Sequence, residues 1–571
     1  MKNKLHIKTI ISAIVISTIV LFGIISAKNI SGSVDGEDVV ALGQVLGAAS
    51  LLPTILAIYV AFTYKNVILA LLAGNLLGAA MYVCINGNPL LSFFTATCTG
   101  MVDTVADRDN ASILVLCLAI GGLVEIIRNS GGFEDLAKRM TKRINTPRKA
   151  NLITQLLGII VFFDDYANSL IVGPIMRPIM DKLKISREKL AYIVDSTAAP
   201  VTGIAIISSW VAVEVAVIEE GLANANVNMS GYSLFLQAIP YCFYCIFCLL
   251  FIFISSLTRR EFGPMLKAEN RARSGIVKKD ESHDNELEID NEKKASLWVA
   301  VLPLIFLFIY AVYMFYTTGR VNALEAGLIS GSEPFSIHLL STIFGQADTI
   351  FIVFEAAIFA SFIAIILGII EKVYSLKEGL HSFIRGCSQL LETDIILVLA
   401  WTMSAFVSKI GTVHYAVNII TSNVVWFLVP VFIFVVCCVV SFAVGSYGCM
   451  FIALPMAIPI AITIIELNPN IPSSFLPLVI ACGLAGSIFG DHCSPITDCT
   501  ILSSEGSGCN NFDHVKTQLP YALVTAVVAV VVGVVPATFG VNPIISFIGS
   551  GIAFYLILKV FGKVPGKDIN N

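Results

Sequence analysis

The chain has 571 residues, of which 56% are hydrophobic and 13% are charged, and its formal net charge is -4. Its mean hydropathy of +0.85 is far above that of a soluble globular protein. These values exclude a water-soluble globular protein, and we expect a chain that lies in a lipid bilayer and has no nucleic-acid partner.

The predicted elements are membrane spans, because apolar runs of roughly 20 residues recur along the chain. We count about 12 full spans and two longer, broken segments. The first apolar run, within residues 1–27, follows Lys2, Lys4 and Lys8 and is either a first span or a cleaved signal peptide. Spans at 44–63, 66–85 and 111–128 follow. The last ends in a basic stretch at 138–149, which indicates a cytoplasmic loop.

Residues 150–181 predict a re-entrant hairpin. The segment is too long for one span, has a polar string at 162–169 and is basic at both flanks, so it enters from the cytoplasm and returns there. Spans at 190–217 and 234–257 follow. The charged stretch 258–294 has no hydrophobic period and is interpreted as a solvated cytoplasmic linker.

The second half begins with spans at 296–315, 350–370 and 394–410. An amphipathic segment at 375–392 is expected to lie along the cytoplasmic interface. The apolar stretch 425–465 has no Lys or Arg at either flank, which predicts a second hairpin that enters from outside. A broken span at 475–504 and two closing spans return the C-terminus to the cytoplasm, and the N-terminus is also cytoplasmic if the first segment is retained.

The two long segments are similar to each other, and the charge rule gives them opposite orientations. Pairs at the hairpins share an offset of 281 residues, and pairs at the broken spans share an offset of 295: 165–168 with 446–449, Pro174 with Pro455, Pro178 with Pro459, and 200–202 with 495–497. The predicted fold is therefore an all-α polytopic membrane protein with about 12 transmembrane helices plus two re-entrant hairpins, in two inverted-topology repeats.

We expect five segments in chain order. An N-terminal span or signal-like segment with an external loop (1–43) precedes the first repeat (44–257). The charged linker (258–295) joins it to the second, inverted repeat (296–541). The last span and a cytoplasmic tail (542–571) complete the chain.

Breaks in membrane helices predict the site, because irregular backbone is tolerated at that depth only around an enclosed or wet cavity. An ionised carboxylate there costs about 2.5 to 3.5 kcal/mol, yet five lie at the breaks: Asp164, Asp165, Asp195, Asp491 and Asp498. Oxygen donors suited to an alkali cation lie among them: Asn168, Ser196, Thr197, Thr202, Ser446, Ser494, Thr497 and Thr500.

Structural roles are the alternative for these residues, since Asp caps helices and Ser and Thr bond back to helix carbonyls. Adjacent residues cannot share one helix face, so a single ligand from Asp164 and Asp165 is expected. His492 is a candidate proton relay, or it simply hydrogen-bonds to the backbone. Charged residues near predicted span ends are left outside the site: Glu125, Arg128, Glu214, Glu355, Asp394 and Lys409.

Residues 483–504, GLAGSIFGDHCSPITDCTILSS, are similar to the NhaC-type sodium/proton antiporter family. The resemblance extends to FFDDYANS at 162–169 and DSTAAPV at 195–201, and by the order of spans it covers most of the chain from about residue 44. It implies an exchanger of the ion-transporter superfamily, with paired hairpins, usually dimeric, in which a transport bundle moves against a scaffold. The family also contains exchangers of organic acids such as malate and lactate.

We therefore predict a secondary transporter that exchanges sodium or lithium for protons at carboxylates on broken helices. Burial favours the protonated form of a carboxylate and a bound cation favours the ionised form, so the two compete for one site. We expect no cofactor, no catalytic residue and no metal beyond transported sodium, since the proton and sodium gradients drive exchange. The expected setting is the inner (plasma) membrane, as a homodimer in contact with lipid.

The alternative is a carrier of organic acids or amino acids coupled to sodium or protons, which needs a cationic or donor-rich pocket. Arg177 or the half-helix N-termini could supply one. The sequence offers few buried basic residues near the breaks, which favours a bare cation. An intramembrane aspartyl protease would use aspartates on facing helices without inverted hairpins, and nothing resembles a repeated channel pore loop.

Overall fold

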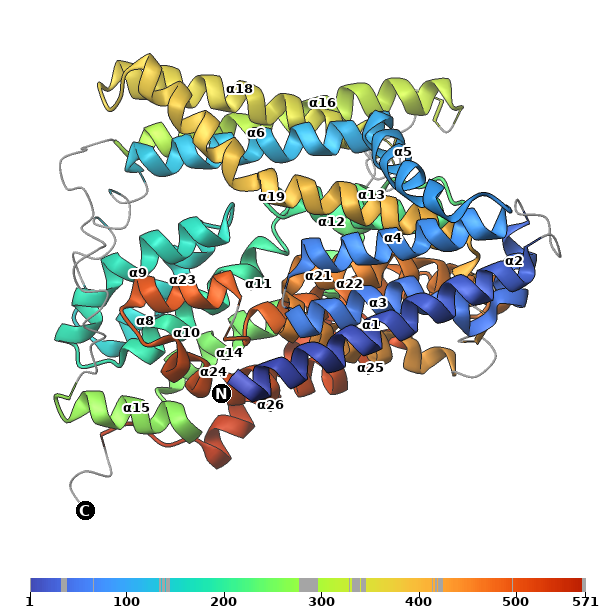
Figure 1. Cartoon of the computed structure of the whole chain (residues 1–571). Coiled ribbons are helices and arrows are strands. Elements are labelled where there is room, and N and C mark those ends of the chain that lie inside the picture. The colour runs from blue at the N-terminus through green and yellow to red at the C-terminus, as the bar shows by residue number, and fades with distance from the viewer. Residues whose placement is uncertain are drawn as a thin grey trace.

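The computed structural model describes residues 2–31, 38–64, 66–132, 135, 139, 144–276, 296–327, 329–330, 339, 343, 346–412, 414–415, 418–419, 425–495 and 497–566. Within these ranges the regular structure is helical apart from one isolated backbone bridge (Figure 1). Ten helices are long and apolar enough to cross a membrane, or eleven with the bent pair Gly231–Tyr241 and Phe243–Thr258. The sequence predicts about 12, because it counts segments that breaks divide into shorter helices.

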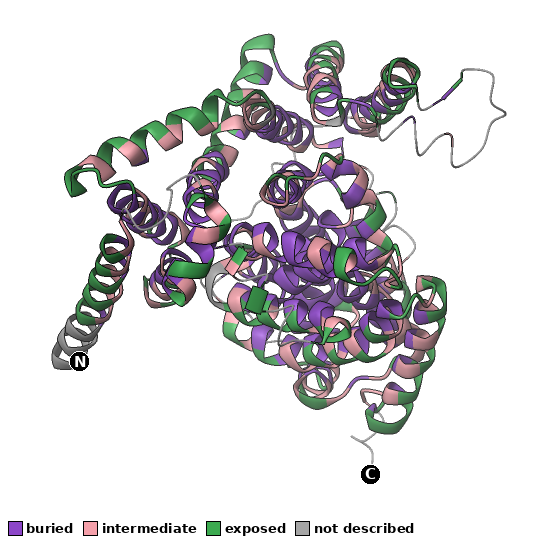
Figure 2. Ribbon diagram, turned by 90° about the vertical axis from the view of Figure 1, so that its right-hand side faces the viewer, coloured by how far each residue is buried: buried purple, intermediate pink, exposed green. Residues whose placement is uncertain are grey.

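The helices of the first half up to the first hairpin are α1 (Lys2–Ile30), α2 (Val39–Leu46), α3 (Leu52–Tyr64), α4 (Val67–Ile85), α5 (Phe93–Ala106) and α6 (Arg108–Ser130). The first helices of the second half are α16 (Leu297–Glu325), α18 (Thr349–Ile370) and α19 (Leu376–Lys409). Helices α6, α16 and α18 lie side by side in an outer layer, with α19 beneath them (Figure 1). Buried residues concentrate in the central bundle, while residues 12–30 of α1 are mostly exposed or half-buried (Figure 2).

The first hairpin consists of α8 (Pro147–Ile160) and α9 (Asp165–Lys182), which pack together. Thr146 caps α8, and Pro147 occupies its first turn, where the missing N–H of proline has no intrahelical partner to lose. The 14 residues of α8 span only about 21 Å, which is less than the roughly 30 Å of a bilayer core. The segment therefore turns back inside the membrane, as the sequence predicts.

The second hairpin is α21 (Val429–Leu467), which bends back at Gly445. Gly445 has φ 80° and ψ 171°, a conformation that glycine adopts without steric cost. The Cys449 thiol donates to the carbonyl oxygen of Cys437, twelve residues earlier, at 3.5 Å. A straight helix would separate these residues by about 18 Å, so the two arms of α21 lie against each other.

Two spans are broken near the hairpins. The first comprises α10 (Arg187–Thr197), α11 (Ala199–Thr202) and α12 (Val211–Asn224), with an irregular stretch at 203–210. The second comprises α22 (Phe475–Asp491) and α23 (Asp498–Ser507), separated by residues 492–497. The remaining helices are α13 (Gly231–Ala238), α14 (Phe243–Thr258), α15 (Gly263–Arg273), α24 (Asn511–Val528), α25 (Val535–Thr538) and α26 (Pro543–Phe561).

The base of the first hairpin lies beside the C-terminal end of α26. Arg148 donates to the carbonyl of Leu257 at the end of α14. A few residues further on, Glu261 exchanges two backbone hydrogen bonds of 2.9 Å with Lys563. The base of the first hairpin, the start of the linker and the end of α26 therefore lie on the same side of the membrane.

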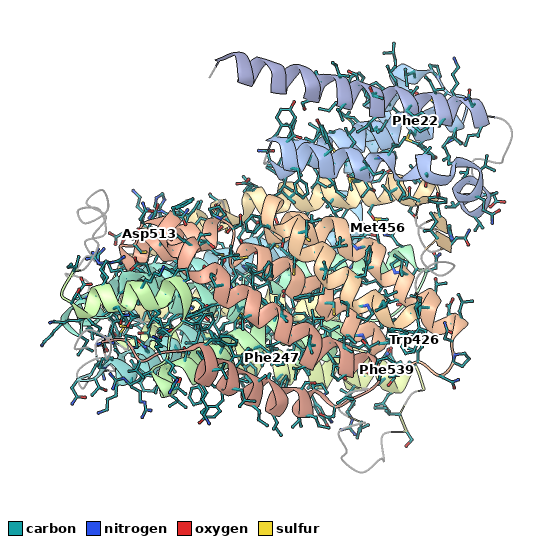
Figure 3. All side chains as sticks on the ribbon, turned by 90° about the horizontal axis from the view of Figure 1, so that it is seen from below. Phe22, Phe247, Trp426, Met456, Asp513 and Phe539 are labelled. Atoms are coloured by element: carbon teal, nitrogen blue, oxygen red, sulfur yellow. The ribbon has the colours of Figure 1, made fainter. Side chains whose placement is uncertain are left out.

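The base of the second hairpin lies at the other end of α26. The Trp426 ring packs against Phe539 with ring centroids 5.9 Å apart, just before α26 begins. The 19 residues of α26 span about 28 Å, so the two hairpins enter from opposite sides. Figure 3 shows Trp426 and Phe539 at one end of the molecule and Asp513 at the other. This arrangement agrees with the predicted inverted topology.

Two local expectations were wrong. The start of the predicted solvated linker forms α15, which packs on the bundle: Glu269 accepts hydrogen bonds from the backbone N–H and hydroxyl of Ser186, each at 2.8 Å. Segment 375–392 is not a separate interfacial element, because it continues with 394–410 as the single helix α19. Residues 277–295 of the linker and part of the predicted basic stretch lie outside the described residues, and the five segment boundaries stay predictions.

Candidate ion-binding site

A cavity of about 310 Å³ lies where the tips of the two hairpins meet. The first hairpin contributes 164–166, the second contributes 445–448, and the break between α22 and α23 contributes Asp491 and 497–499. Helix α19 closes the cavity with residues from Gln389 to Ile396. Segments that are hundreds of residues apart in the chain thus enclose one polar space.

Five acidic side chains line this cavity: Asp164, Asp165, Glu392, Asp491 and Asp498. The described lining residues include no Lys, Arg or His. Such a space attracts cations and repels anions. Glu392 was not predicted, because it lies in the continuous helix α19, where no break in the sequence draws attention to it.

Asp491 lies at the C-terminal end of α22, where the helix dipole is negative and favours a cation. Its Oδ2 accepts a hydrogen bond from Ser446 at the tip of the second hairpin, at 3.1 Å. Its backbone oxygen accepts from the hydroxyls of Thr497 and Thr500, both at 2.8 Å. Carboxylate, carbonyl and hydroxyl oxygens from three segments therefore converge here.

The adjacent acids of the first hairpin have different surroundings. Asp164 caps α9, with Oδ1 accepting from the Ala167 N–H at 2.7 Å, which is the structural alternative considered for it. Asp165 lies inside α9, and its Oδ2 accepts from the Cys499 thiol at 2.7 Å. Tyr166 donates to Asp498 Oδ2 at 3.2 Å. The tip of this hairpin is therefore bonded to the start of α23.

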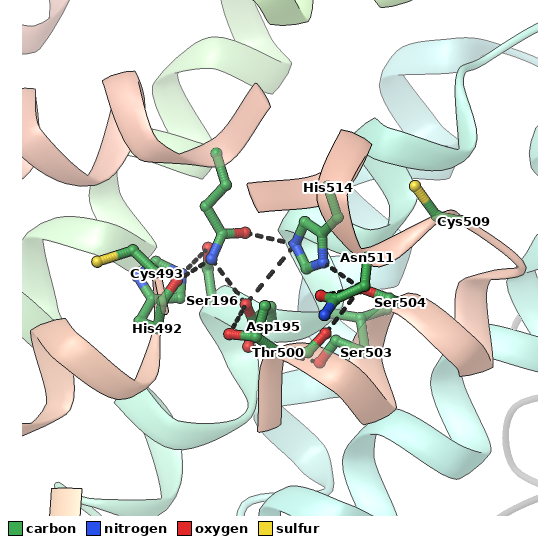
Figure 4. A network of polar contacts seen from close by, with 12 residues as sticks. Asp195, Ser196, His492, Cys493, Thr500, Ser503, Ser504, Cys509, Asn511 and His514 are labelled. Carbon is green, nitrogen blue, oxygen red and sulfur yellow. Dashed lines mark hydrogen bonds and ion pairs between the residues drawn. The ribbon is translucent and has the colours of Figure 1, made fainter. Parts of the chain in front are cut away.

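Asp195 is fully buried and lies beside the cavity in a polar network that meets the Asp491 site at Thr500 (Figure 4). Its Oδ2 accepts from Thr500 at 3.2 Å and from Gln518 Nε2 at 2.7 Å. His514 Nε2 lies 3.6 Å from the same oxygen. The His514 ring also bonds the Ser504 hydroxyl at 2.7 Å and the Gln518 amide oxygen at 2.6 Å.

His514 and Gln518 were missed from the sequence. They are four positions apart and therefore share one face of α24, and both are fully buried. A pair of polar residues at this spacing on one face of a membrane helix is the signal that could have indicated them. The Cys499 thiol, which bonds Asp165, was also missed from the sequence.

His492 is fully buried and does not line the cavity. Its Nε2 bonds the Ser196 hydroxyl at 2.7 Å, and its Nδ1 bonds the Tyr244 hydroxyl on α14, also at 2.7 Å. Both ring nitrogens are thus engaged with side chains, not with the backbone alone. The proton-relay role of His492 stays a prediction.

The other predicted donors shape the breaks. Asn168 Nδ2 donates to the carbonyls of Gly158 and Thr197 at 2.8 and 2.7 Å. The Thr197 hydroxyl bonds back to its own helix, and Ser494 donates to the Phe442 carbonyl at 2.8 Å. The Thr202 hydroxyl is buried without a hydrogen-bond partner among the described residues. None of these four side chains lines the cavity.

The chain is similar to a known family of transporters and to individual members of known sequence. The model of the Na+/H+ antiporter family matches residues 10–205 and 201–536. An uncharacterized protein of Haemophilus influenzae is 30% identical over 518 residues, covering 90% of this chain and 95% of that protein. The Malate-2H(+)/Na(+)-lactate antiporter of Bacillus subtilis is 33% identical over 191 residues, which is 31% of this chain and 38% of that protein.

Among solved structures, the YdaH transporter of Alcanivorax borkumensis has a similar fold. The TM-score is 0.54 at 11% sequence identity, and the match covers 80% of this chain and 90% of that chain. The fold and the family match together define a multi-pass secondary transporter. More specifically, the chain belongs to the Na+/H+ antiporter family.

Proposed function

We propose that this transporter exchanges sodium or lithium for protons, with Asp491 as the central carboxylate of the cation site. The Ser446, Thr497 and Thr500 hydroxyls would complete the coordination with the Asp491 backbone oxygen. These are hard oxygen ligands of the kind that alkali and alkaline-earth cations prefer. Asp165 and Asp498 would hold further protons or cations at the facing half-helices.

The observation that carries this proposal is the charge of the cavity wall. Five acids and no described base line the space, so an organic anion would enter against repulsion at close range. A cation or proton would enter with attraction. When a proton binds Asp491, the negative charge that holds the cation is lost, and the cation is released; the reverse step follows on the other side of the membrane.

Three features favour the carrier of organic acids as a second candidate. The relative from Bacillus subtilis is named for malate and lactate, and a cavity of about 310 Å³ is larger than a bare ion needs. The N-termini of α9 and α23 also face this space and could bind a carboxylate. Arg177, the basic residue considered for this role, lies against Gly508 and outside the cavity lining.

We further propose that the protein works in the inner (plasma) membrane as a homodimer, without a cofactor, driven by the proton and sodium gradients. Basic residues on the side shared by the first hairpin base and the C-terminus support a cytoplasmic assignment of that side. The family resemblance supports the dimer. We propose cytoplasmic termini for the chain with its first segment retained.

The test is dissipation of a pH gradient in proteoliposomes that contain the purified protein. Sodium, lithium, potassium, malate and lactate are added separately, and then sodium is added with each acid. We expect sodium or lithium alone to collapse the gradient. A response that requires malate or lactate would contradict the antiporter and favour the organic-acid carrier.

A further inference from the structure

Glu214 is a buried carboxyl group outside the cavity. It lies in the first turn of α12, directly after the irregular stretch that breaks the first span. The side chain is fully buried. Within the described part of the chain, neither carboxylate oxygen has a hydrogen-bond partner. The sequence places Glu214 near a span end as an interfacial or paired residue, and the structure instead buries it within the bundle.

A charge in this position would be costly. Burying an ionised carboxylate without a partner costs far more than burying the neutral acid, and such groups neutralise instead. An ionisable residue inside a membrane protein is by default a candidate for function. Glu214 therefore has a physical reason to hold a proton in the conformation described here.

The neighbours of Glu214 favour a proton over a metal cation. The titratable groups near enough to Glu214 for a charge–charge interaction are Cys242 at the N-cap of α14, Cys245 on α14 and Tyr447 on α21. Gly203 at the end of α11 also adjoins it, since a Cβ there would lie 3.4 Å from Glu214 Oε1. Thiols and a phenol are poor ligands for an alkali cation, which prefers several hard oxygens. A proton needs no such shell.

An aromatic pair links Glu214 to the cavity. Trp210, the N-cap residue of α12, packs against Tyr447 with ring centroids 5.0 Å apart. Both residues line the acidic cavity, and the Glu214 backbone N–H donates to the Trp210 carbonyl oxygen at 3.0 Å. These rings come from the two halves of the chain, from the break of the first span and the tip of the second hairpin. Motion of either element would change access to Glu214.

We propose that Glu214 is a second proton-binding site of the transporter, reached from the acidic cavity when the contact between Trp210 and Tyr447 opens. The site takes a proton from cavity water to form the neutral acid and returns it to water. This inference rests on the proposed exchange for its role in coupling. Proton binding itself is testable without transport.

The first test is infrared difference spectroscopy of the purified protein between acidic and alkaline buffer. We expect wild type to show the carbonyl band of a protonated carboxylic acid that is missing in Glu214→Gln. The matched control Glu355→Gln, on α18 and bonded to Tyr310, should keep this band. Identical carboxyl bands in wild type and Glu214→Gln would overturn the proposal.

If Glu214→Gln fails to fold, Glu214→Asp keeps a titrating group at the same position. Its carboxyl band should be shifted relative to wild type, and an unshifted spectrum would overturn the proposal. Both outcomes are independent of the transported cation.

The second test measures the number of protons exchanged per cation, from the membrane potential at which net sodium flux stops in proteoliposomes. We expect Glu214→Gln to exchange fewer protons per sodium ion, whereas Glu355→Gln keeps the wild-type ratio. An unchanged ratio in Glu214→Gln would overturn the coupling role. Absence of cation-dependent proton movement in wild type would instead contradict the proposed function and leave the infrared result standing.

Discussion

The carboxylates at the breaks differ in what surrounds them, and this difference separates their expected roles. Asp491 lines the cavity, and its carboxylate accepts a hydrogen bond from the Ser446 hydroxyl. Asp195 is fully buried and bonded to an amide and a hydroxyl. Asp164 caps a helix. Substitution at these positions should therefore affect different properties.

Replacing Asp491 with Asn removes the charge but keeps the size of the side chain. Because charge-assisted contacts contribute about 1.5 to 3 kcal/mol, we expect Asp491→Asn to weaken sodium binding about 10- to 100-fold. Glu355→Gln should leave the affinity unchanged. The measurement is sodium-dependent fluorescence or calorimetry on purified protein, and wild-type affinity in Asp491→Asn would remove this residue from the site.

Asn168 is a predicted ligand whose side chain instead holds two backbone segments together. Asn168→Ala removes the donor to two buried carbonyls, of Gly158 and Thr197, and each unsatisfied group costs about 1 to 3 kcal/mol. We expect a clearly lower melting temperature in detergent. Asn86→Ala, which loses one exposed bond to Tyr82, is the control and should change little. Equal melting temperatures for the two variants would contradict this role.

At this scale the sequence predicts the residues next to helix breaks but not their partners. Glycine, proline and polar interruptions in apolar runs predict Asp491, Ser446 and Thr497 as site residues. All three line the cavity. Glu392 and His514 lie within continuous helices, so only the packing of distant segments brings them near the site. The sequence indicates an interfacial position for Glu214, because it does not show which helices surround α12 and bury this side chain.

At the scale of elements, the second hairpin is held by close contact with α22. A Cβ at Gly486 would lie 2.7 Å from the carbonyl oxygen of Phe434 and 2.8 Å from the Cβ of Cys437. These contacts are shorter than van der Waals distance, and one of them is with backbone, which cannot rotate away. The hairpin arm can pack here only because position 486 has no side chain.

Gly486→Ala should therefore destabilise the protein by about 1 to 3 kcal/mol, the usual cost of overpacking. The matched control is Gly551→Ala on α26, where the nearest atom is the Leu250 Cδ2 at 3.9 Å and alanine favours the helix. Thermal unfolding in detergent compares the two variants. A melting temperature of Gly486→Ala equal to that of Gly551→Ala would show that the hairpin does not need this contact.

Both hairpins are predictable from the sequence, because length, broken polarity and flanking charge all appear locally. The packing of α15 and the continuity of α19 are not predictable from the sequence. Helix α15 is charged enough to resemble a solvated linker, yet Met265 and Ala272 are fully buried against the bundle. Helix α19 continues for 34 residues, and no local signal shows that its amphipathic start and apolar end form one helix.

At the scale of the whole molecule, the two hairpins open toward opposite sides of the membrane. Lys267 on α15 and Asn470 after α21 are both exposed, and they lie on the sides of the first and second hairpin base, respectively. We expect Asn470→Cys to react with an impermeant maleimide in intact cells and Lys267→Cys to react only after permeabilisation. Cys98, which is exposed, is first replaced by Ser. Labelling of both from the same side would contradict the inverted topology.

Cation exchange at the acidic cavity is the central claim, and sodium uptake into proteoliposomes under an imposed pH gradient tests it most directly. With no organic acid present, wild type should accumulate radioactive sodium inside acidic vesicles, driven by protons leaving. Asp491→Asn should stay at the level of empty vesicles, while Glu355→Gln should match wild type. Sodium uptake by Asp491→Asn at the wild-type rate, or no uptake by wild type until malate or lactate is added, would contradict the account.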